Sequence, residues 1–331
     1  MKAVVLVGGE GTRLRPLTYS TPKQLLPVAG RPMIERVLGH LANHGVSEAV
    51  LSLGYRPDAF LAAYPDGYCA GVRVKYAVEP EPRGTAGGIA FAARYAGLDK
   101  TFVVVNGDVL TGLDVSKVVA FHRQRGAAAT VTLTPVDDPS RYGVVVTDDE
   151  GLVAAFIEKP PAGEAPTNLI SAGTYVLEPS VIERIPADRA VSVERETFPA
   201  LVEAGTLYAL ASDADWVDAG TPAAYLEANL SYAALDSQWV SADAVVDPAA
   251  SVTSAVIGPG AIVDAGARVE SSVLMAGVRV GPNSVIHESI IGTAAVIGEG
   301  AVVEALTVIG DGVTVDAGQR LHAAKVPEAA A

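Results

Sequence analysis

Residues 6–27 of the chain read LVGGEGTRLRPLTYSTPKQLLP, and the glycines of this stretch follow directly on a short apolar strand, KAVVLV. The stretch contains three glycines, Gly8, Gly9 and Gly11. Glycines let the backbone turn tightly and bring its N–H groups against an anion, because no Cβ stands in the way. Arg13 and Lys23 follow, and such side chains supply the countercharge that a polyphosphate needs. The stretch therefore predicts a phosphate-rich ligand over a loop after the first strand.

The charge distribution favours a small polyanion as this ligand. The chain carries a formal net charge of −14, yet residues 1–36 hold six basic side chains against two acidic ones. Nucleic acids and anionic membranes need a broad basic face on their partner, so we expect neither to bind here. A basic loop in an otherwise acidic chain fits a small, highly charged molecule better.

The length of 331 residues predicts two domains, each with its own core. No stretch approaches the ~18 uninterrupted apolar residues of a membrane span, and the first residues do not have the layout of a signal peptide. The single cysteine, Cys69, has no partner for an internal disulfide. We therefore expect a cytoplasmic protein, with Cys69 as a small buried or turn residue and not a nucleophile.

Strand-like and helix-like segments alternate along residues 1–135. Apolar strand-like runs lie at 3–7, 49–54, 72–78 and 101–109, and helix-like segments lie at 32–45, 87–97 and 115–126. The run at 101–109 is continuously apolar, as expected for a strand buried on both faces of a sheet. This alternation predicts a doubly wound α/β sheet with its ligands at the carboxyl ends of the strands. A helix that begins near Pro222 leads out of the domain.

After Asp247, aliphatic residues recur every five or six positions. They are Val252, Ile257, Val263, Val269, Leu274, Val280, Ile286, Ile291, Ile297, Val303, Ile309 and Val315. Corresponding members lie 17 residues apart, with one extra residue before Ile309. This hexapeptide pattern predicts a parallel β-helix with three flat faces and about four coils. The expected boundaries are 1–235 for the first domain, 236–322 for the β-helix and 323–331 for a frayed tail.

Several motifs resemble those of the sugar-1-phosphate nucleotidyltransferases, also called NDP-sugar pyrophosphorylases. The family signature GGxGTRLxPLT, PK and LxP stands here as GGEGTRLRPLT, Pro22-Lys23 and Leu25-Leu26-Pro27. Further matches are Asn106-Gly107-Asp108, Tyr142-Gly143-Val144-Val145, Glu158-Lys159-Pro160, Ser171-Ala172-Gly173 and Trp216-Val217-Asp218-Ala219-Gly220-Thr221-Pro222. The resemblance covers essentially the whole chain. It implies a mixed, Rossmann-like catalytic sheet followed by a left-handed β-helix.

The resemblance also implies a reaction, in which a sugar-1-phosphate oxygen attacks the α-phosphorus of a nucleoside triphosphate and pyrophosphate leaves. Two anions must be brought together, so charge neutralisation and alignment carry most of the catalysis. We expect Arg13 to stabilise the departing pyrophosphate, Lys23 to hold the triphosphate and Lys159 to orient the sugar phosphate. The implied nucleotide-binding set also includes Leu6, Gly8, Gly9, Gly11, Thr12, Glu79, Gly84, Thr85 and Asp108.

Two aspartates of these motifs suit a Mg²⁺ ion. Asp108 ends an apolar strand and Asp218 lies at another strand-to-turn junction, and a Mg²⁺ that bridges phosphate oxygens takes few protein carboxylates. Each aspartate alone would be interpreted as a cap or turn residue, and the resemblance favours the metal. The implied sugar-phosphate-binding set is Gly143, Glu158, Lys159, Ser171 and Asp218.

Glu79 indicates which base is bound. Guanine offers N–H donors at N1 and N2, which one carboxylate can accept together, whereas thymine and uracil offer one donor flanked by acceptors. Residues 106–109 and 192–199 also resemble mannose-1-phosphate guanylyltransferases. Gln24 is typical of thymidylyl members, and Ser171 stands where guanylyl members usually carry asparagine. We expect guanylyl transfer from GTP to mannose-1-phosphate.

Two other interpretations remain. One is a glucose-1-phosphate thymidylyl- or uridylyltransferase, and the other is a non-catalytic regulatory paralogue that senses sugar nucleotides. The basic and acidic residues of the motifs argue against the sensor, because a pure binder has no reason to keep metal-binding and leaving-group residues. The β-helix is expected to be a spacer or an oligomerisation surface, and a homo-oligomer is expected.

Overall fold

The computed structural model describes residues 1–54, 56–236 and 239–327. It divides into two compact units. The first comprises Met1–Gly9 and Ile34–Trp216, and the second comprises Glu10–Met33 and Val217–Ala331. This division differs from the boundary expected at residue 235, because residues 10–33 leave the strand that precedes them and pack with the C-terminal part of the chain.

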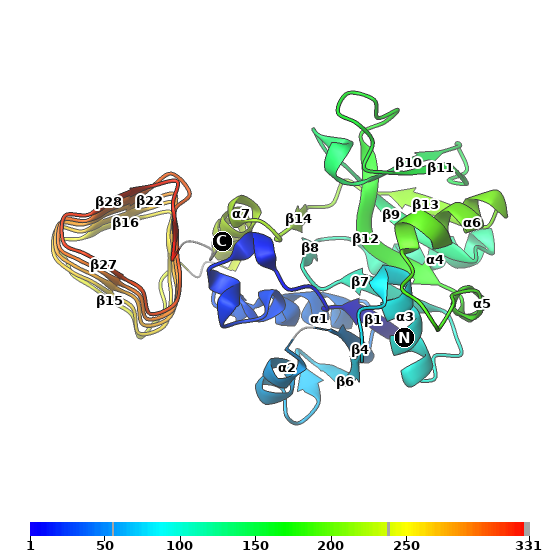
Figure 1. Ribbon diagram of the computed structural model, residues 1–331, viewed down its shortest axis with the longest axis horizontal. Coiled ribbons are helices and arrows are strands. Elements are labelled where there is room, and N and C mark those ends of the chain that lie inside the picture. Colours follow the sequence, from blue (N-terminus) through cyan, green and yellow to red (C-terminus); the bar gives the residue numbers. More distant parts are fainter. Residues whose placement is uncertain (55, 237–238, 328–331) are drawn as a thin grey trace. The chain divides into compact units, whose positions relative to one another are not determined.

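The first unit contains a ten-stranded mixed sheet (Figure 1). Its strands are β1 (Lys2–Leu6), β4 (Glu48–Leu53), β5 (Tyr68–Cys69), β6 (Val72–Val78), β7 (Phe102–Asn106), β9 (Ala129–Pro135), β10 (Gly143–Thr147), β11 (Val153–Glu158), β12 (Leu169–Leu177) and β13 (Leu207–Ala211). Strand β1 runs parallel to β4 and β7, and β12 runs antiparallel to β7, β9 and β10. The expected doubly wound mixed sheet is confirmed, and β10 and β11 form an antiparallel hairpin.

Helices cover both faces of this sheet. The helices of the first unit are α1 (Met33–Asn43), α2 (Pro57–Ala63), α3 (Gly84–Tyr95), α4 (Val115–Arg125), α5 (Pro179–Glu183) and α6 (Phe198–Glu203). Helix α7 (Pro222–Asp236) belongs to the second unit. Ile89 of α3 packs in one cluster with Val131 of β9, whereas His122 of α4 is hydrogen-bonded through Nδ1 to Thr130 Oγ1 at 2.9 Å. Because neighbouring residues of a strand face opposite sides, α3 and α4 lie on opposite faces.

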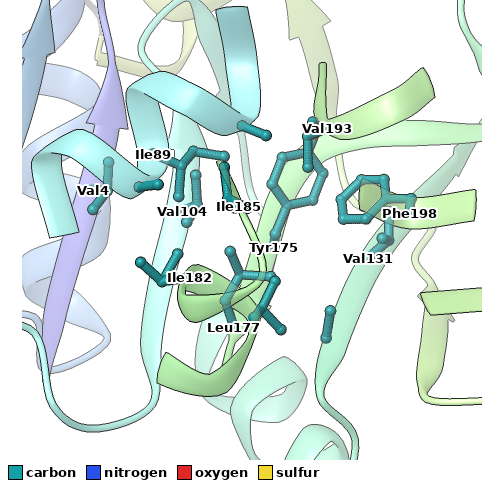
Figure 2. Close-up of a cluster of buried hydrophobic side chains, with 14 of the residues drawn as sticks. Val4, Ile89, Val104, Val131, Tyr175, Leu177, Ile182, Ile185, Val193 and Phe198 are labelled. Atoms are coloured by element: carbon teal, nitrogen blue, oxygen red, sulfur yellow. The ribbon is translucent and has the colours of Figure 1, made fainter. Parts of the chain in front are cut away.

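Figure 2 shows the cluster under α3, α5 and α6. The rings of Tyr175 and Phe198 lie edge to face with centroids 5.1 Å apart. Leu177 and Ile182 belong to the same cluster, with Ile182 on the side of Val104. Burial raises the pKa of the Tyr175 phenol well above its usual range. Residues 193–203 form a π-helical turn (η5, Val193–Thr197) followed by α6.

The second unit contains the predicted β-helix, and its triangular outline is visible in Figure 1. One face holds β15 (Val245–Val246), β18 (Ile262–Val263), β21 (Arg279–Val280), β24 (Val296–Ile297) and β27 (Thr314–Val315). The second holds β16 (Ser251–Thr253), β19 (Arg268–Glu270), β22 (Val285–His287), β25 (Val302–Glu304) and β28 (Arg320–His322). The third holds β17 (Val256–Ile257), β20 (Val273–Leu274), β23 (Ile290–Ile291), β26 (Val308–Ile309) and β29 (Lys325–Val326). Three stacked parallel sheets of this kind are typical of a left-handed β-helix.

The β-helix is longer than the sequence pattern indicated. Each face has five strands where about four coils were expected, and β29 extends the regular coil past residue 322. The aliphatic pattern fades at both ends because Val246, Leu321 and Val326 are only partly buried against the core. Of the tail expected at 323–331, residues 328–331 lie outside the described part of the chain.

The single extra residue before Ile309 is accommodated at a corner. Four corresponding corners each contain one residue with positive φ, at Ser254, Ser271, Glu288 and Ala323, whereas the corner between Glu288 and Ala323 contains two, Ala305 and Leu306. The register therefore shifts by one there, so that Ile290 pairs with Val308. The aliphatic side chains that follow remain in the core.

Candidate functional site

Gly11 is the glycine whose conformation the phosphate-binding loop requires. Its φ is +65°, and a Cβ there would lie 3.0 Å from Cγ2 of Thr18. The Thr18 hydroxyl donates to the Gly11 carbonyl at 2.8 Å and closes the turn. Nothing lies within 4 Å of a Cβ placed on Gly9, and one on Gly8 would make only an ordinary contact with Gly54. Gly8 and Gly9 therefore leave open space at the end of β1.

Three short 3₁₀ helices carry the loop onward, η1 (Thr12–Leu14), η2 (Leu17–Tyr19) and η3 (Lys23–Leu25). In the described part of the chain, the backbone N–H groups of residues 10–13 donate no hydrogen bond. Consecutive amides in such a turn form a concavity that binds an anion. The loop thus has the geometry that its glycines predicted, and Thr12 lies inside it.

Lys23 adds positive charge next to Gly11 in this turn. Its side chain is buried, with 8% of the residue exposed, and its Cβ lies 3.2 Å from the position of a Cβ on Gly11. Placing an ammonium group in the interior costs free energy unless negative charge is near. Lys23 therefore places a positive charge directly beside the turn.

Arg13 and Asp218 come together although they are far apart in the sequence. Nη2 of Arg13 lies 3.9 Å from Oδ2 of Asp218, and the two side chains are 52% and 20% exposed. The Gly220 N–H donates to Oδ1 of Asp218 at 3.1 Å. A Cβ on Gly220 would lie 2.6 Å from Nη2 of Arg13 and 2.8 Å from Oδ1 of Asp218. Glycine at position 220 therefore makes the room in which the guanidinium meets the carboxylate.

The predicted metal ligands have the chemistry that Mg²⁺ requires. Asp108 lies in the turn between β7 and β8 (Val109–Thr111) of the first unit, and Asp218 ends β14 (Trp216–Asp218). Mg²⁺ is bound by one or two carboxylates together with phosphate oxygens and water, so two aspartates fit this ion. The described residues contain no cluster of three or more His, Cys, Asp and Glu side chains suited to a metal.

Glu79 is held in a defined position by its neighbours in the first unit. Ser52 Oγ donates to Oε1 of Glu79 at 2.7 Å, and the Arg83 N–H donates to Oε2 at 3.1 Å. Each carboxylate oxygen has two lone pairs, so both can accept a further hydrogen bond from a base. A Cβ on Gly88 would lie 2.8 Å from Oε1, which explains the glycine in α3. Ser52 was not predicted, because nothing in its local sequence marks it as a partner of Glu79.

Gly84 and Thr85 have clear structural roles at the start of α3. Gly84 has φ +69°, and a Cβ there would lie 2.6 Å from the Val191 carbonyl oxygen. Thr85 Oγ1 donates to Oε2 of Glu194 at 2.8 Å and accepts from the Val193 N–H at 2.8 Å. These contacts join the loop after Glu79 to residues 191–194. In this structure both residues hold the loop in place, and their predicted contact with a nucleotide stays a prediction.

The predicted sugar side is built from the hairpin of β10 and β11. Gly143 pairs with Glu158, and a Cβ on Gly143 would lie 2.7 Å from the Phe156 ring, so this glycine is needed for packing. Lys159 has φ +51°, a backbone conformation that non-glycine residues rarely adopt. Its Nζ lies 3.4 Å from Oε1 of Glu158, with the lysine side chain 58% exposed. Lys159 is thus held at the end of β11 with its ammonium group accessible.

Ser171 lies where β12 shifts register against β9. Its Oγ is buried, and its interaction with the Tyr175 hydroxyl acts on the pKa of that phenol. Nearby, Gly173 has φ +74°, and a Cβ there would lie 2.7 Å from Nδ2 of Asn106.

The Gly107 N–H donates to the Leu6 carbonyl at 2.9 Å. Leu6 therefore contributes its backbone to the turn that carries Asp108.

The structure gathers the predicted residues into separate groups. Within the second unit it brings together Gly11, Thr12, Arg13, Lys23 and Asp218. The first unit contains the group around Glu79, Gly84 and Thr85, and the pair Glu158 and Lys159 on its hairpin.

Comparison with known proteins identifies the family. Residues 2–234 match the family described as Nucleotidyl transferase, and residues 235–329 match the GMPPB C-terminal domain. The first match covers well over half of the chain. The chain therefore belongs to the nucleotidyl transferase family, as the sequence motifs predicted.

Individual relatives narrow this class. The chain is 47% identical over 222 residues to the mannose-1-phosphate guanylyltransferase of Mycobacterium tuberculosis, an alignment that covers 66% of this chain and 61% of the relative. It is 42% identical over 238 residues to the mannose-1-phosphate guanyltransferase of Aspergillus fumigatus, which covers 70% and 64%. The chain thus spans slightly less than two thirds of the curated relatives it matches.

Among solved structures, HddC from Yersinia pseudotuberculosis complexed with GMP-PN has a TM-score of 0.60 and 31% identity, over 70% of this chain and 99% of that one. A putative glucose-1-phosphate thymidylyltransferase from Bacillus anthracis has a TM-score of 0.62 and 28% identity, over 69% of this chain and 94% of that one.

None of the helices that the structure describes has both the length and the apolar character of a membrane-spanning segment.

Proposed function

We propose that the chain transfers GMP from GTP to mannose-1-phosphate and releases pyrophosphate. A phosphate oxygen of mannose-1-phosphate attacks the α-phosphorus of GTP in line with the bond to the β-phosphate. The new P–O bond forms as the bond to pyrophosphate breaks, which yields GDP-mannose. The attacking phosphate is already ionised, so the reaction needs alignment and charge neutralisation more than a general base.

The observation that carries this proposal is the geometry of the loop in the second unit. The open amides of residues 10–13, the buried Lys23 and the guanidinium of Arg13 provide positive potential in one place. Donors arranged before the reaction stabilise charge that develops on a leaving group. We assign Lys23, Gly8, Gly9, Gly11 and Thr12 to the triphosphate and Arg13 to the departing pyrophosphate.

The choice of guanine is supported by Glu79. Its carboxylate is fixed by Ser52 and the Arg83 N–H, so it presents acceptors only, which match the N1–H and N2–H donors of guanine. The two curated relatives named above act on guanine nucleotides by name, and the similar HddC structure contains GMP-PN. Gly84 and Thr85 are assigned to the same base-reading loop.

The sugar phosphate is assigned to the hairpin in the first unit. The exposed ammonium of Lys159 suits the phosphate, while Glu158 can accept hydrogen bonds from sugar hydroxyls. Ser171 Oγ is buried and interacts with the Tyr175 hydroxyl, and its contact with the sugar is assigned from the motif resemblance alone. Gly143 would let the sugar ring approach only where Phe156 does not already cover it.

Mg²⁺ is proposed as the cofactor, with Asp108 and Asp218 as its carboxylate ligands. When bound, the ion would neutralise phosphate oxygens of the nucleotide and fix their orientation. Asp218 presents its Oδ2 toward Arg13, so the same carboxylate can orient the guanidinium when no ion is present. Asp218 and Gly220 therefore determine where the Arg13 guanidinium lies.

A second candidate function is glucose-1-phosphate thymidylyl transfer. Gln24 favours it, because this residue is 2% exposed and its Oε1 has no hydrogen-bond partner among the described residues. A buried amide oxygen of this kind can accept the single N–H donor of thymine. The similarity to a putative thymidylyltransferase of Bacillus anthracis points the same way.

A matrix of nucleotides and sugars tests these alternatives. Native protein with Mg²⁺ is incubated with GTP, dTTP, UTP and ATP against mannose-1-phosphate and glucose-1-phosphate, and released pyrophosphate is measured. We expect the highest kcat/KM for GTP with mannose-1-phosphate, and a Glu79→Gln variant that loses preference for GTP over dTTP. Highest activity with dTTP would support the second candidate. Binding of sugar nucleotides without any pyrophosphate release would support the sensor.

Assembly and location are also proposals. A homo-oligomer is proposed because two apolar side chains at the start of the β-helix are exposed. Val245 of strand β15 is 60% exposed, and Val240, which precedes this strand, is 46% exposed. The cytoplasm is proposed from the single cysteine. Sedimentation analysis of the full chain would report its oligomeric state directly.

A further inference from the structure

Residues 13–20 of the phosphate-binding loop contact the last coil of the β-helix, and both segments belong to the second unit. Nζ of Lys325, on β29, donates to the backbone carbonyl of Arg13 at 3.0 Å. Oγ of Ser20 donates to Oδ2 of Asp311 at 2.5 Å. These bonds join residues that lie 312 and 291 positions apart in the sequence. We call Asp311 and Lys325 the coil anchors.

Between the two anchors, a proline ring packs on the coil. Pro16 is buried, and a Cβ on Gly310 would lie 3.1 Å from Cβ of Pro16 and 3.3 Å from Cδ of Pro327. Such distances are shorter than ordinary carbon contacts. Glycine at position 310 therefore lets the loop approach the corner of the coil closely.

Asp311 is fixed by the coil before it contacts the loop. Its Oδ1 accepts a hydrogen bond from the Thr293 N–H at 2.8 Å, and a Cβ on Gly292 would lie 2.7 Å from that same oxygen. Oδ2 is the atom that accepts from Ser20. A carboxylate whose first oxygen is held by its own scaffold presents the second in a defined direction.

Arg13 is consequently held at two points. Its backbone carbonyl accepts from Lys325, and its guanidinium lies beside Asp218. The first contact sets the position of its Cα, and the second sets the direction of its side chain. Both contacts are needed if the guanidinium is to meet a charge that appears only in the transition state.

We propose that the last coil of the β-helix positions the catalytic loop, with Lys325 and Asp311 acting through Arg13. The expected effect on kcat rests on the proposed function, whereas the contacts of Lys325 and Asp311 with the loop do not depend on that function. It gives the β-helix a role beyond that of a spacer. Lys325 and Asp311 are positioning residues, since neither is assigned a contact with the substrates.

The kinetic test uses substitutions in the full-length chain with saturating Mg²⁺. Lys325→Met removes the donor to Arg13, and we expect kcat to fall about five- to tenfold with KM for GTP within about twofold of native. Lys325→Arg keeps a donor of similar reach and should restore kcat. Arg320→Met removes an exposed cation from the same coil on another face and should leave kcat unchanged. A native kcat in Lys325→Met would overturn the proposal.

A double-substitution cycle separates positioning from simple structural support. If Lys325 acts through Arg13, then Lys325→Met should change kcat less than about twofold in an Arg13→Ala background. Equal losses of activity in the native and Arg13→Ala backgrounds would show that Lys325 acts independently, against the proposal. Asp311→Asn, with Asp316→Asn as the matched control, repeats the cycle from the other anchor.

Hydrogen exchange tests the anchors without reference to activity. The amides of Leu14, Arg15 and Tyr19 donate within the loop, and their protection reports how firmly the loop is held. We expect their exchange to be at least about threefold faster in Lys325→Met and Asp311→Asn, and native in Arg320→Met. Unchanged exchange in the anchor variants would contradict the inference, whatever the activity of the protein. Absence of pyrophosphate release by the native protein would refute only the proposed function.

Discussion

The substitution Gly220→Ala tests how closely the site is fitted around Arg13. The added methyl would lie 2.6 Å from Nη2 of Arg13 and 2.8 Å from Oδ1 of Asp218. Ordinary contact needs roughly 3.5 Å, so the guanidinium must retreat by about 1 Å. A misplacement of that size can reduce a rate about 100-fold, which corresponds to about 2.7 kcal/mol of transition-state stabilisation.

The same substitution should hardly change stability. The displaced guanidinium belongs to a side chain that is 52% exposed, in an ion pair at 3.9 Å. Such pairs contribute little, so the free energy of unfolding should change by less than about 1 kcal/mol. The expected result is therefore a large loss of kcat in a protein that unfolds like the native one.

The assay measures pyrophosphate release at saturating GTP and mannose-1-phosphate, together with urea denaturation of each variant. Gly258→Ala serves as the contrasting control. Its methyl would lie 2.8 Å from the backbone of Leu274 and Met275, so it should lower the free energy of unfolding by about 1–3 kcal/mol and leave kcat unchanged in the folded protein. A Gly220→Ala variant with native kcat would refute the reasoning.

Three further predictions concern residues of the first unit. Gly84→Ala forces φ +69° on a residue whose Cβ would lie 2.6 Å from the Val191 carbonyl, so thermal melting should show a loss of at least about 1 kcal/mol; an unchanged melting temperature would contradict this. Burial lowers the pKa of His122 below 6.5. The contribution of neutral His122 to the free energy of unfolding is therefore complete above about pH 6.5. It declines as the pH falls toward the folded-state pKa, by up to about 1.4 kcal/mol per pH unit. His122→Gln should flatten this decline in denaturation curves between pH 7.5 and 5.5, and an identical decline would disprove the assignment. Burial raises the pKa of the Cys69 thiol to about 12, so native protein should react with iodoacetamide far more slowly than denatured protein; equal rates would show that the thiol is accessible.

Local patterns made much of the fold predictable. The alternating segments of the first unit and the hexapeptide pattern after Asp247 are visible because each residue type reports on its own burial. The pattern failed at the ends of the β-helix, where Leu321 and Val326 are partly exposed and the aliphatic signal weakens. The helix α2 was not predicted either, since its seven residues are too few to establish a periodicity.

The candidate site was predictable as motifs but not as contacts. The sequence indicated Arg13 and Asp218 separately, and only the structure shows that Gly220 makes room for them to meet. Gly84 and Gly143 are predicted to contact ligands, and only the structure shows that Val191 and Phe156 also require glycine at these two positions. A glycine looks the same in a sequence whether a ligand or the protein itself occupies the space beside it.

The packing of residues 10–33 could not be inferred from the order of residues. The expected boundary at residue 235 coincides with the division between the two family matches, 2–234 and 235–329. Residues 10–33 instead pack with the C-terminal part, where Asn229 accepts from the Ala29 N–H at 2.9 Å and Tyr225 donates to the Pro27 carbonyl. Contacts across some 200 positions leave no local signature.

The most direct test of the central claim is the turnover of Arg13→Ala beside Arg15→Ala. Both arginines lie in the same loop, but Arg15 pairs with Glu10 at 3.2 Å and is not assigned to the leaving group. The account predicts that Arg13→Ala lowers kcat for GTP and mannose-1-phosphate about 100- to 1,000-fold in a folded protein, while Arg15→Ala stays within about threefold of native. Near-native turnover in Arg13→Ala, or equal losses in both variants, would contradict it.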